Sequence, residues 1–350
     1  MIRTRQYRSW SAVFHEDHAA RPISIQMELT YRCPLHCIHC YSDCYNNPGS
    51  EDKELSADGV KDMMDKLYDA GCLWLCLTGG DPLVRSDFPD IYEYARRKGF
   101  VVTVFTSLAS LDDVVLKKFI DIPPFVIEVT VNGATPETYE RVSQVKGSFS
   151  RVMANMKKIT DARLPLRIKA MVLRENMHEM DILSDLGRSF GCDVMSSAII
   201  SARLDGDSAP CKHRVEIDDL VRSGPAAGAY CGAGYLDKAD PGTRDREKNT
   251  LFSCPAGKWQ WNIDPVGRLS LCAHLREPSY DLSKGDLKDG MRALYGYVKT
   301  GGFSKPSECE RCEIRRLCYS CPGRAKLETG DEGTPVPYFC ELARREAERS

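Results

Sequence analysis

The sequence is organised around residues 23–40, which read ISIQMELTYRCPLHCIHC. The apolar run over residues 23–29 predicts a β-strand, and the cysteine-bearing segment behind it predicts a loop at the carboxyl end of that strand. Cys33, Cys37 and Cys40 have the spacing C-x3-C-x2-C. Three thiolates can bind three irons of a [4Fe–4S] cluster and leave the fourth iron open to a small molecule. A zinc knuckle, which needs a fourth ligand, and a set of buried cysteines are the alternatives.

Length and composition indicate a globular protein with an unusual number of cysteines. The chain has 350 residues, 42% of them hydrophobic and 28% charged, and its net charge of −2 does not favour binding to nucleic acid or an anionic membrane. No apolar run reaches the roughly 18 residues of a membrane helix, and residues 1–14 lack an apolar signal core. Sixteen cysteines in such a chain favour metal–sulfur clusters in a reducing cytoplasm over disulfides.

Strand-like and helix-like segments alternate between residues 23 and 200, which predicts six βα units and a parallel sheet. Ser56 is the expected N-cap of the first helix and Gly99 the expected end of the second. The pattern fits a doubly wound sheet as well as a barrel, and in both the site lies at the carboxyl ends of the strands. The expected strands are 23–29, 73–78, 100–105, 125–131, 166–173 and 193–200, and the later helices are 88–98, 111–120, 135–142, 148–162 and 180–190.

The cysteine motif, with an aromatic residue, His39, before the last cysteine, resembles the signature of the radical S-adenosylmethionine (SAM) enzymes. The resemblance implies a partial (β/α)6 barrel over residues 23–205, after an N-terminal extension of residues 1–22. It implies that the open iron binds the amino and carboxylate groups of SAM. It further implies that one electron from the cluster cleaves SAM to a 5′-deoxyadenosyl radical, which abstracts a hydrogen atom from the substrate.

Further segments match the SAM-binding motifs of this family. Gly79-Gly80-Asp81 follows a strand and resembles the GGE motif whose backbone binds the SAM amino group, with Asp81 in place of the usual Glu. The segment from Glu128 to Pro136 resembles a motif that often reads ISLDGATP, although Asn132 replaces its Asp. The residues that the resemblance assigns to SAM are His39, Gly79, Gly80, Asp81, Thr130 and Arg141, with Thr106 and Ser107 as candidates for the ribose. A tight turn, a β-branched strand residue and a solvated arginine are the structural alternatives for these segments.

The cysteines at the end of the chain resemble the SPASM domain of radical SAM enzymes that modify peptides and proteins. Seven of them follow the SPASM order, except that only two residues separate Cys318 from Cys321. The resemblance implies a bridging region over residues 206–250, a SPASM domain over residues 251–350 and two auxiliary [4Fe–4S] clusters. The expected ligands are Cys254, Cys272 and Cys321 for the nearer cluster and Cys309, Cys312, Cys318 and Cys340 for the outer one. Structural zinc bound by the same thiolates is the alternative.

The nearer auxiliary cluster is one cysteine short of a full set. Some SPASM relatives supply a fourth ligand six residues after the first cysteine, and that position is Gln260 here. A carboxamide is a poor ligand for an iron–sulfur site, so we expect an open iron or a ligand from elsewhere, such as Cys231. We expect Phe252, Trp259 and Trp261 to pack this region.

The whole pattern predicts a cytoplasmic radical SAM enzyme with three [4Fe–4S] clusters that modifies a ribosomally synthesised peptide by crosslinking, thioether formation, epimerisation or backbone excision. The expected partners are the peptide, a flavodoxin- or ferredoxin-type electron donor and a separate protein that recognises the leader peptide. Two rival interpretations remain open: a sulfatase-maturing enzyme that forms formylglycine, and a zinc or iron–sulfur scaffold without turnover. The first is less favoured because the segment Cys272-Ala273-His274 stands where such maturases often carry an Asp base just after the cysteine.

Overall fold

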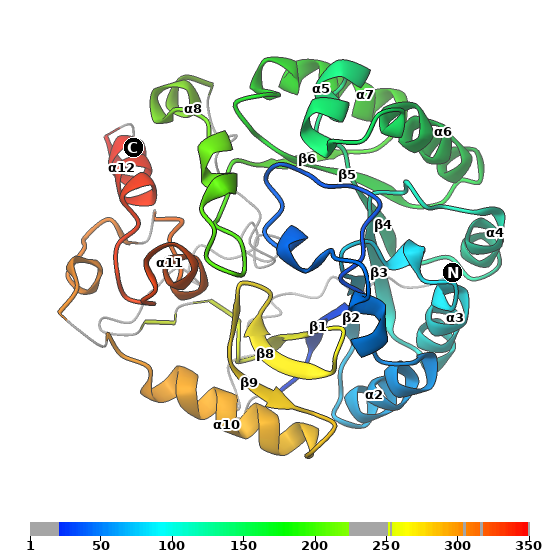
Figure 1. Cartoon of the computed structure of the whole chain (residues 1–350), viewed down its shortest axis with the longest axis horizontal. Coiled ribbons are helices and arrows are strands. Elements are labelled where there is room, and N and C mark those ends of the chain that lie inside the picture. The colour runs from blue at the N-terminus through cyan, green and yellow to red at the C-terminus, as the bar shows by residue number, and fades with distance from the viewer. Residues whose placement is uncertain (1–20, 224–250, 253, 304–305, 316–317, 349–350) are drawn as a thin grey trace, which may run out of the picture.

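A nine-stranded sheet forms the centre of the molecule (Figure 1). The structure, a computed structural model, describes residues 21–223, 251–252, 254–303, 306–315 and 318–348. The strand order across the sheet is β6-β5-β4-β3-β2-β1-β7-β8-β9. The strands are β1 (Ser24–Glu28), β2 (Trp74–Thr78), β3 (Val101–Thr106), β4 (Val126–Thr130), β5 (Leu166–Met171), β6 (Val194–Ser197), β7 (Gln260–Ile263), β8 (Arg268–Cys272) and β9 (Leu275–Asp281).

The first six strands are parallel and lie in their sequence order, with helices between them (Figure 1). A doubly wound sheet reverses its strand order at a switch point, so this order distinguishes a barrel from that alternative. The predicted partial (β/α)6 barrel is therefore confirmed. The helices of this part are α2 (Ala57–Asp69), α3 (Phe88–Lys98), α4 (Asp113–Asp121), α5 (Pro136–Ser143), α6 (Ser148–Asp161), α7 (Met180–Ser189) and α8 (Ile217–Ser223).

Local signals set several helix ends where the sequence predicted them. The Ser56 hydroxyl accepts a hydrogen bond from the Gly59 N–H at 3.2 Å and caps α2. Helix α3 ends at Gly99, whose φ of +104° is a conformation that glycine adopts without a Cβ penalty. The last strand of the barrel, β6, is shorter than expected. Ile199 and Ile200 lie beyond its end and are nevertheless buried. Burial of an apolar pair does not require a strand, so the apolar pattern overestimated its length.

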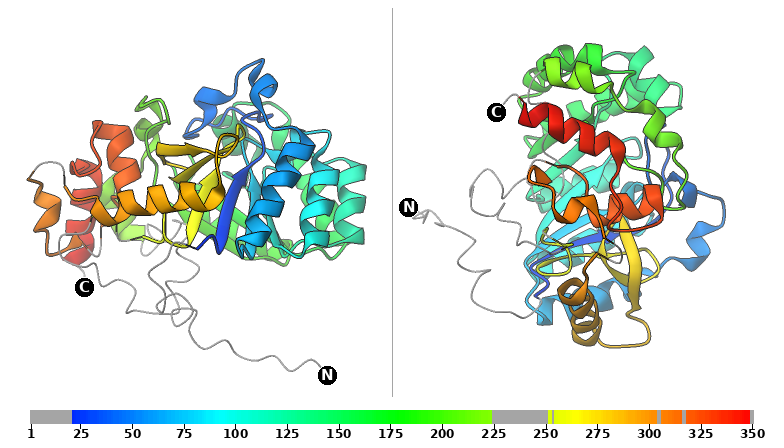
Figure 2. Two further views of the ribbon diagram at one scale, coloured as in Figure 1. Left: turned by 90° about the horizontal axis from the view of Figure 1, so that it is seen from below. Right: turned by 90° about the vertical axis from the view of Figure 1, so that its left-hand side faces the viewer.

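The carboxyl-terminal strands continue the barrel sheet. Strand β7 pairs in parallel with β1, with Ser24 opposite Gln260, and β8 and β9 follow in antiparallel order. The proposed domain boundary at residue 251 therefore does not coincide with a break in the sheet. Trp261 and Phe252 are buried as expected. Of the remaining helices, α10 (Leu287–Thr300) and α11 (Pro322–Thr329) contact β9, whereas α12 (Pro337–Ala347) packs against α8 (Figures 1 and 2).

We compared the helices of the described ranges with the requirements for a membrane span. None of the helices there has both the length and the apolar character needed to cross a bilayer.

A buried ion pair joins β1 to β9. Glu28, the last residue of β1, is 5% exposed and accepts from Nη2 of Arg276 at 2.9 and 2.7 Å. Arg276 also donates from Nη1 to the Tyr31 hydroxyl at 3.0 Å and from Nε to the Ala273 carbonyl at 3.2 Å. All three kinds of guanidinium nitrogen are therefore used. The strand that leads into the first cysteine loop is thus tied to the strand that follows Cys272.

We predict that Arg276→Met destabilises the fold by about 3–5 kcal/mol, because it leaves the Glu28 carboxylate buried without its cation. Urea denaturation of preparations matched for iron content measures the difference. The control is Arg292→Met on α10, whose pair with Asp289 is exposed and should contribute about 1 kcal/mol or less. Equal effects of the two changes would contradict a structural role for the buried pair.

Candidate active site

Main-chain hydrogen bonds hold the cysteine loop in place. The N–H groups of His36 and Ile38 donate to the Ser143 and Val142 carbonyls, both at 3.0 Å, so the loop is attached to the last turn of α5. The Asn46 side chain accepts from the Cys33 N–H at 3.0 Å and donates to the Cys33 carbonyl at 3.1 Å. In Figure 1 the loop crosses the open end of the barrel, where the carboxyl ends of the parallel strands meet.

The three thiols of this loop act on one another electrostatically. Burial raises the pKa of Cys33, Cys37 and Cys40, and neighbouring negative charges raise the values for Cys33 and Cys37 further: Asp81, Cys37 and Cys40 act on Cys33, and Cys40 and Asp43 act on Cys37. Grouped thiolates in such a place need a strong positive charge beside them, which a bound iron cluster supplies. The residues present therefore fit the cluster that the sequence predicts.

A cluster of several irons and a single metal ion need different arrangements of donors. Within the described ranges, no three His, Cys, Asp or Glu side chains are arranged to hold a metal ion. The cysteine ligands of a four-iron cluster each bind a different iron, so their sulfurs do not need to meet at one point.

Gly79 and Gly80 let the turn after β2 approach the cysteine loop closely. A Cβ on Gly79, whose φ is +150°, would lie 2.3 Å from the Thr30 carbonyl oxygen, and one on Gly80 would lie 2.4 Å from that of Arg32. The Gly80 N–H donates to the Thr30 carbonyl at 2.7 Å. Any side chain here would displace the loop. Contact between this turn and the SAM amino group stays a prediction, and backbone carbonyls are the atoms that would accept from it.

Asp81 is fully buried and acts as an acceptor for neighbouring groups. It accepts from the Leu83 N–H at 3.1 Å, the Thr106 hydroxyl at 2.7 Å and the Ser107 N–H at 2.9 Å, and also from the Ser107 hydroxyl. Burial raises the pKa of Asp81, while these hydrogen bonds oppose the rise. The hydroxyls of Thr106 and Ser107, which we expected near the ribose, thus donate hydrogen bonds to Asp81. The three side chains join the ends of β2 and β3.

Thr130 and Arg141 lie on consecutive elements. Thr130 is the last residue of β4 and is half-buried. Arg141 lies in the last turn of α5, where its side chain is 47% exposed and pairs with Glu137 at 3.3 Å. The next two residues, Val142 and Ser143, provide the two carbonyls that accept hydrogen bonds from the cysteine loop. Contact of Thr130 and Arg141 with SAM stays a prediction.

Sequence reasoning missed Glu179, which holds the start of α5. Its carboxylate accepts from the Ala134 N–H at 2.7 Å and from the hydroxyls of Thr135 and Thr138 at 2.6 Å each. Burial alone would raise its pKa, but these hydrogen bonds outweigh burial and the pKa of Glu179 is lowered. No local signal marks it, because it lies about forty residues after the helix that it caps.

His39 is oriented by Asn132. The Asn132 Oδ1 accepts from the Met171 N–H at 2.7 Å, which turns its Nδ2 toward His39 Nε2 at 3.4 Å. Burial lowers the pKa of His39 to about 4, so the ring is neutral at physiological pH. A neutral ring that accepts at Nε2 carries its proton on Nδ1. The Asn at position 132, where the resembling motif has Asp, therefore places an amide N–H beside Nε2 of His39.

The C-terminal cysteines fall into the two expected groups. Burial raises the pKa of Cys272, and the charges of Cys321 and Cys254 raise it further. Burial together with the charges of Cys318, Cys309 and Cys312 raises the pKa of Cys340 to about 11. The assignment of each group to an auxiliary cluster stays a prediction. Gln260 begins β7 beside β1, and Cys231 lies outside the described residues.

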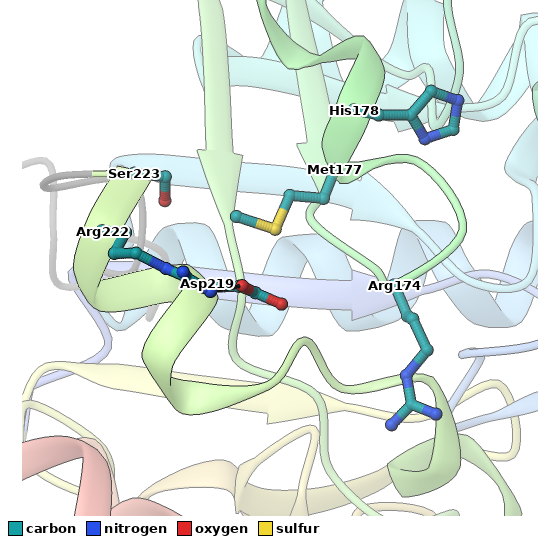
Figure 3. Close-up of a pocket in the computed structure, with 6 residues that line it drawn as sticks. All are labelled: Arg174, Met177, His178, Asp219, Arg222 and Ser223. Carbon is teal, nitrogen blue, oxygen red and sulfur yellow. Dashed lines mark hydrogen bonds and ion pairs between the residues drawn. The ribbon is translucent and has the colours of Figure 1, made fainter.

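One surface hollow lies apart from the predicted site residues (Figure 3). It has a volume of about 500 Å³ and lies between the segment after β5 and helix α8. Figure 3 shows Met177 extending toward α8, where Arg222 pairs with Asp219. The full lining is Arg174, Met177, His178, Asp219, Arg222 and Ser223. None of these residues is a predicted ligand of iron or SAM.

Comparison with known proteins agrees with the geometry of the barrel. The sequence profile described as "Radical SAM superfamily" matches residues 27–186. The PqqA peptide cyclase of Rhizobium meliloti is 31% identical over 330 residues, which cover 90% of this chain and 86% of the relative. The chain belongs to the radical SAM superfamily. It groups there with peptide-modifying enzymes, and the expected radical SAM enzyme, with its SAM and [4Fe–4S] cofactors, is confirmed.

Two further similarities support this grouping. The mycofactocin maturase MftC of Mycolicibacterium smegmatis is 27% identical over 72% of this chain and 64% of the relative. Among solved structures, Streptococcus suis SuiB bound to its precursor peptide SuiA has a TM-score of 0.68 at 16% identity, over 91% of this chain and 76% of that one. At that identity the likeness to SuiB shows a shared fold.

We predict that Arg141→Ala weakens SAM binding by about 1–3 kcal/mol, the usual scale for a hydrogen bond to a charged group. Calorimetric titration of the cluster-loaded protein with SAM measures the change. Glu137→Gln is the control, because it removes only the partner of Arg141 on the helix surface. Unchanged SAM affinity in Arg141→Ala would leave Arg141 as a solvated surface charge.

Proposed function

We propose that this enzyme cleaves SAM reductively and uses the resulting radical to modify a ribosomally synthesised peptide. The observation that carries the proposal is the set of three half-buried thiols of Cys33, Cys37 and Cys40 in the loop at the carboxyl end of β1. The similarity to PqqA peptide cyclase and MftC supports a peptide as the substrate class. Crosslinking, thioether formation, epimerisation and backbone excision all begin with abstraction of one hydrogen atom.

In this proposal each part of the chain has a separate task. The cysteine loop holds the first cluster, which when bound supplies the electron that cleaves SAM. The turn at Gly79 and Gly80 orients the SAM amino group, and Arg141 pairs with its carboxylate. Glu179 fixes the start of α5, and through it the position of Arg141 relative to the loop.

The C-terminal cysteines bind two auxiliary clusters in this proposal, which makes three [4Fe–4S] clusters in total. With Cys254, Cys272 and Cys321 as its ligands, the nearer cluster has three cysteines, and Gln260 occupies the position where some relatives have a fourth. A substrate thiolate can fill that position, or the cluster can accept an electron from the substrate radical. The ion pair between Glu28 and Arg276 supports this role, because it ties the strand after Cys272 to the strand before Cys33.

The remaining partners follow from the same chemistry. A flavodoxin- or ferredoxin-type protein supplies the electron, and a separate protein presents the leader peptide. A reducing cytoplasm is the compartment that suits exposed iron–sulfur chemistry. Formylglycine formation on a sulfatase is the competing activity, and the substrate test below separates the two.

The first test of this proposal is iron analysis after anaerobic reconstitution. We expect about twelve irons per chain, four for each of three clusters. The triple change of Cys33, Cys37 and Cys40 to Ala should leave about eight and abolish formation of 5′-deoxyadenosine, because the auxiliary ligands lie elsewhere in the chain. Cys44→Ala is the matched control and should keep both. About four irons in the wild type, or zinc in their place, would refute the auxiliary clusters.

The second test identifies the substrate. Short peptides encoded beside the gene are incubated with enzyme, SAM and reductant, and their masses are compared with those from the triple cysteine variant. A mass change that needs the three cysteines supports peptide modification. Formylglycine in a sulfatase peptide, with no change in the neighbouring peptides, would replace this proposal with the competing one.

A further inference from the structure

A buried phenol without a protein partner lies at the first cysteine site. Tyr139 of α5 is 2% exposed, and within the described chain its hydroxyl has no hydrogen-bond partner. A buried hydroxyl left unsatisfied costs about 1–3 kcal/mol, and Phe would fill the same space without that cost. Buried polar groups in native proteins are nearly always paired, so an orphan of this kind needs an acceptor that the polypeptide does not supply.

The position of Tyr139 on α5 directs it to the cysteine loop. Residues three and four apart on a helix share a face, and Tyr139 lies three and four positions before Val142 and Ser143. Those two residues accept the hydrogen bonds from the loop N–H groups of His36 and Ile38. Tyr139 therefore lies about one helical turn from the point where the loop is attached, and Cys33 and Cys37 pack against the apolar cluster that contains Tyr139.

The surroundings of the phenol are negative and its ring is fixed. After burial, the charges of Cys37, Asp81 and Cys33 are what raise the pKa of Tyr139 above its ordinary value. The phenol therefore keeps its proton and remains a donor. Phe149 packs at 60° against the ring with centroids 5.7 Å apart. A Cβ on Gly133 would lie 2.5 Å from the Tyr139 nitrogen. The backbone at Gly133 therefore packs directly against the backbone at Tyr139 and leaves no room for a side chain at position 133.

The nearby carboxylate of Asp81 already accepts four hydrogen bonds and has little capacity for another. The other nearby acceptors are the sulfurs of the loop, which carry negative charge when a cluster is bound. We propose that the Tyr139 hydroxyl donates a hydrogen bond to a sulfur of the cluster bound by Cys33, Cys37 and Cys40. This inference rests on the proposed function of that loop. Hydrogen bonds to sulfur favour the more negative, reduced form of a cluster and raise its reduction potential. Tyr139 would thus make the electron-donating cluster easier to reduce.

The test compares Tyr139→Phe with wild-type holoenzyme in a redox titration followed by electron paramagnetic resonance. The SAM-binding cluster is identified in each protein as the one whose signal changes when SAM is added. We expect the midpoint potential of that cluster to shift to a more negative value in Tyr139→Phe, while the other clusters keep theirs. The matched control is Tyr92→Phe on α3, whose buried hydroxyl donates to the Ile122 carbonyl at 2.6 Å and should leave every potential unchanged.

An unchanged potential of the SAM-responsive cluster in Tyr139→Phe overturns the inference, whether or not SAM affinity falls. A fall in SAM affinity without a shift would place the acceptor on SAM and not on sulfur. An equal shift in Tyr92→Phe also overturns it, since the effect would then be general. A wild-type protein with no SAM-responsive cluster refutes the proposed function itself, which separates that failure from the failure of this inference.

Discussion

The attachment of the cysteine loop by main-chain hydrogen bonds is the constraint on which the rest of the site depends. The loop donates to two carbonyls at the end of α5 and accepts from the Gly80 N–H through Thr30. These bonds fix where the thiols of Cys33, Cys37 and Cys40 stand without using any of the three sulfurs. Helix α5 therefore has two tasks, since its start is held by Glu179 and its end holds the loop.

This arrangement concentrates negative groups in a buried place. Asp81 is satisfied by donors from β3 and the segment after it, so it tolerates burial without a cation. Hydrogen bonds also reach the thiols, including those from Ser42 and Asp43 to Cys40, but burial outweighs them and the three pKa values stay raised, so three thiolates alone would be costly there. A positively charged group between them relieves that cost.

Short-range signals predicted much of this fold and long-range contacts escaped them. The alternation of strands and helices, the Ser56 cap and the spacing of the cysteines are local patterns, and each can be read from a few neighbouring residues. Glu179 and Arg276 act on elements far from them in sequence, and their residue types alone carry no sign of the partner. The pairing of β7 with β1 is also non-local, so the carboxyl-terminal region appeared as a separate unit in the sequence. A single sequence therefore predicts helices and strands better than it predicts which of them contact one another.

The buried ion pair is one of two contacts that join the regions of the two cysteine groups. Arg276 of β9 donates to Glu28 of β1 at 2.7 Å and to Tyr31, in the segment before Cys33, at 3.0 Å. Strands β7 and β8 separate β9 from β1, which places the two backbones about 14 Å apart in a flat sheet with neighbours about 4.8 Å apart, and the two long side chains span that separation. The second contact lies beside the first: the ring of Tyr41, next to Cys40, stacks on the ring of His274, two residues after Cys272, with centroids 4.6 Å apart. The segment around Cys272 therefore packs against the first cysteine loop, and the continuous sheet and these side-chain contacts hold the two together.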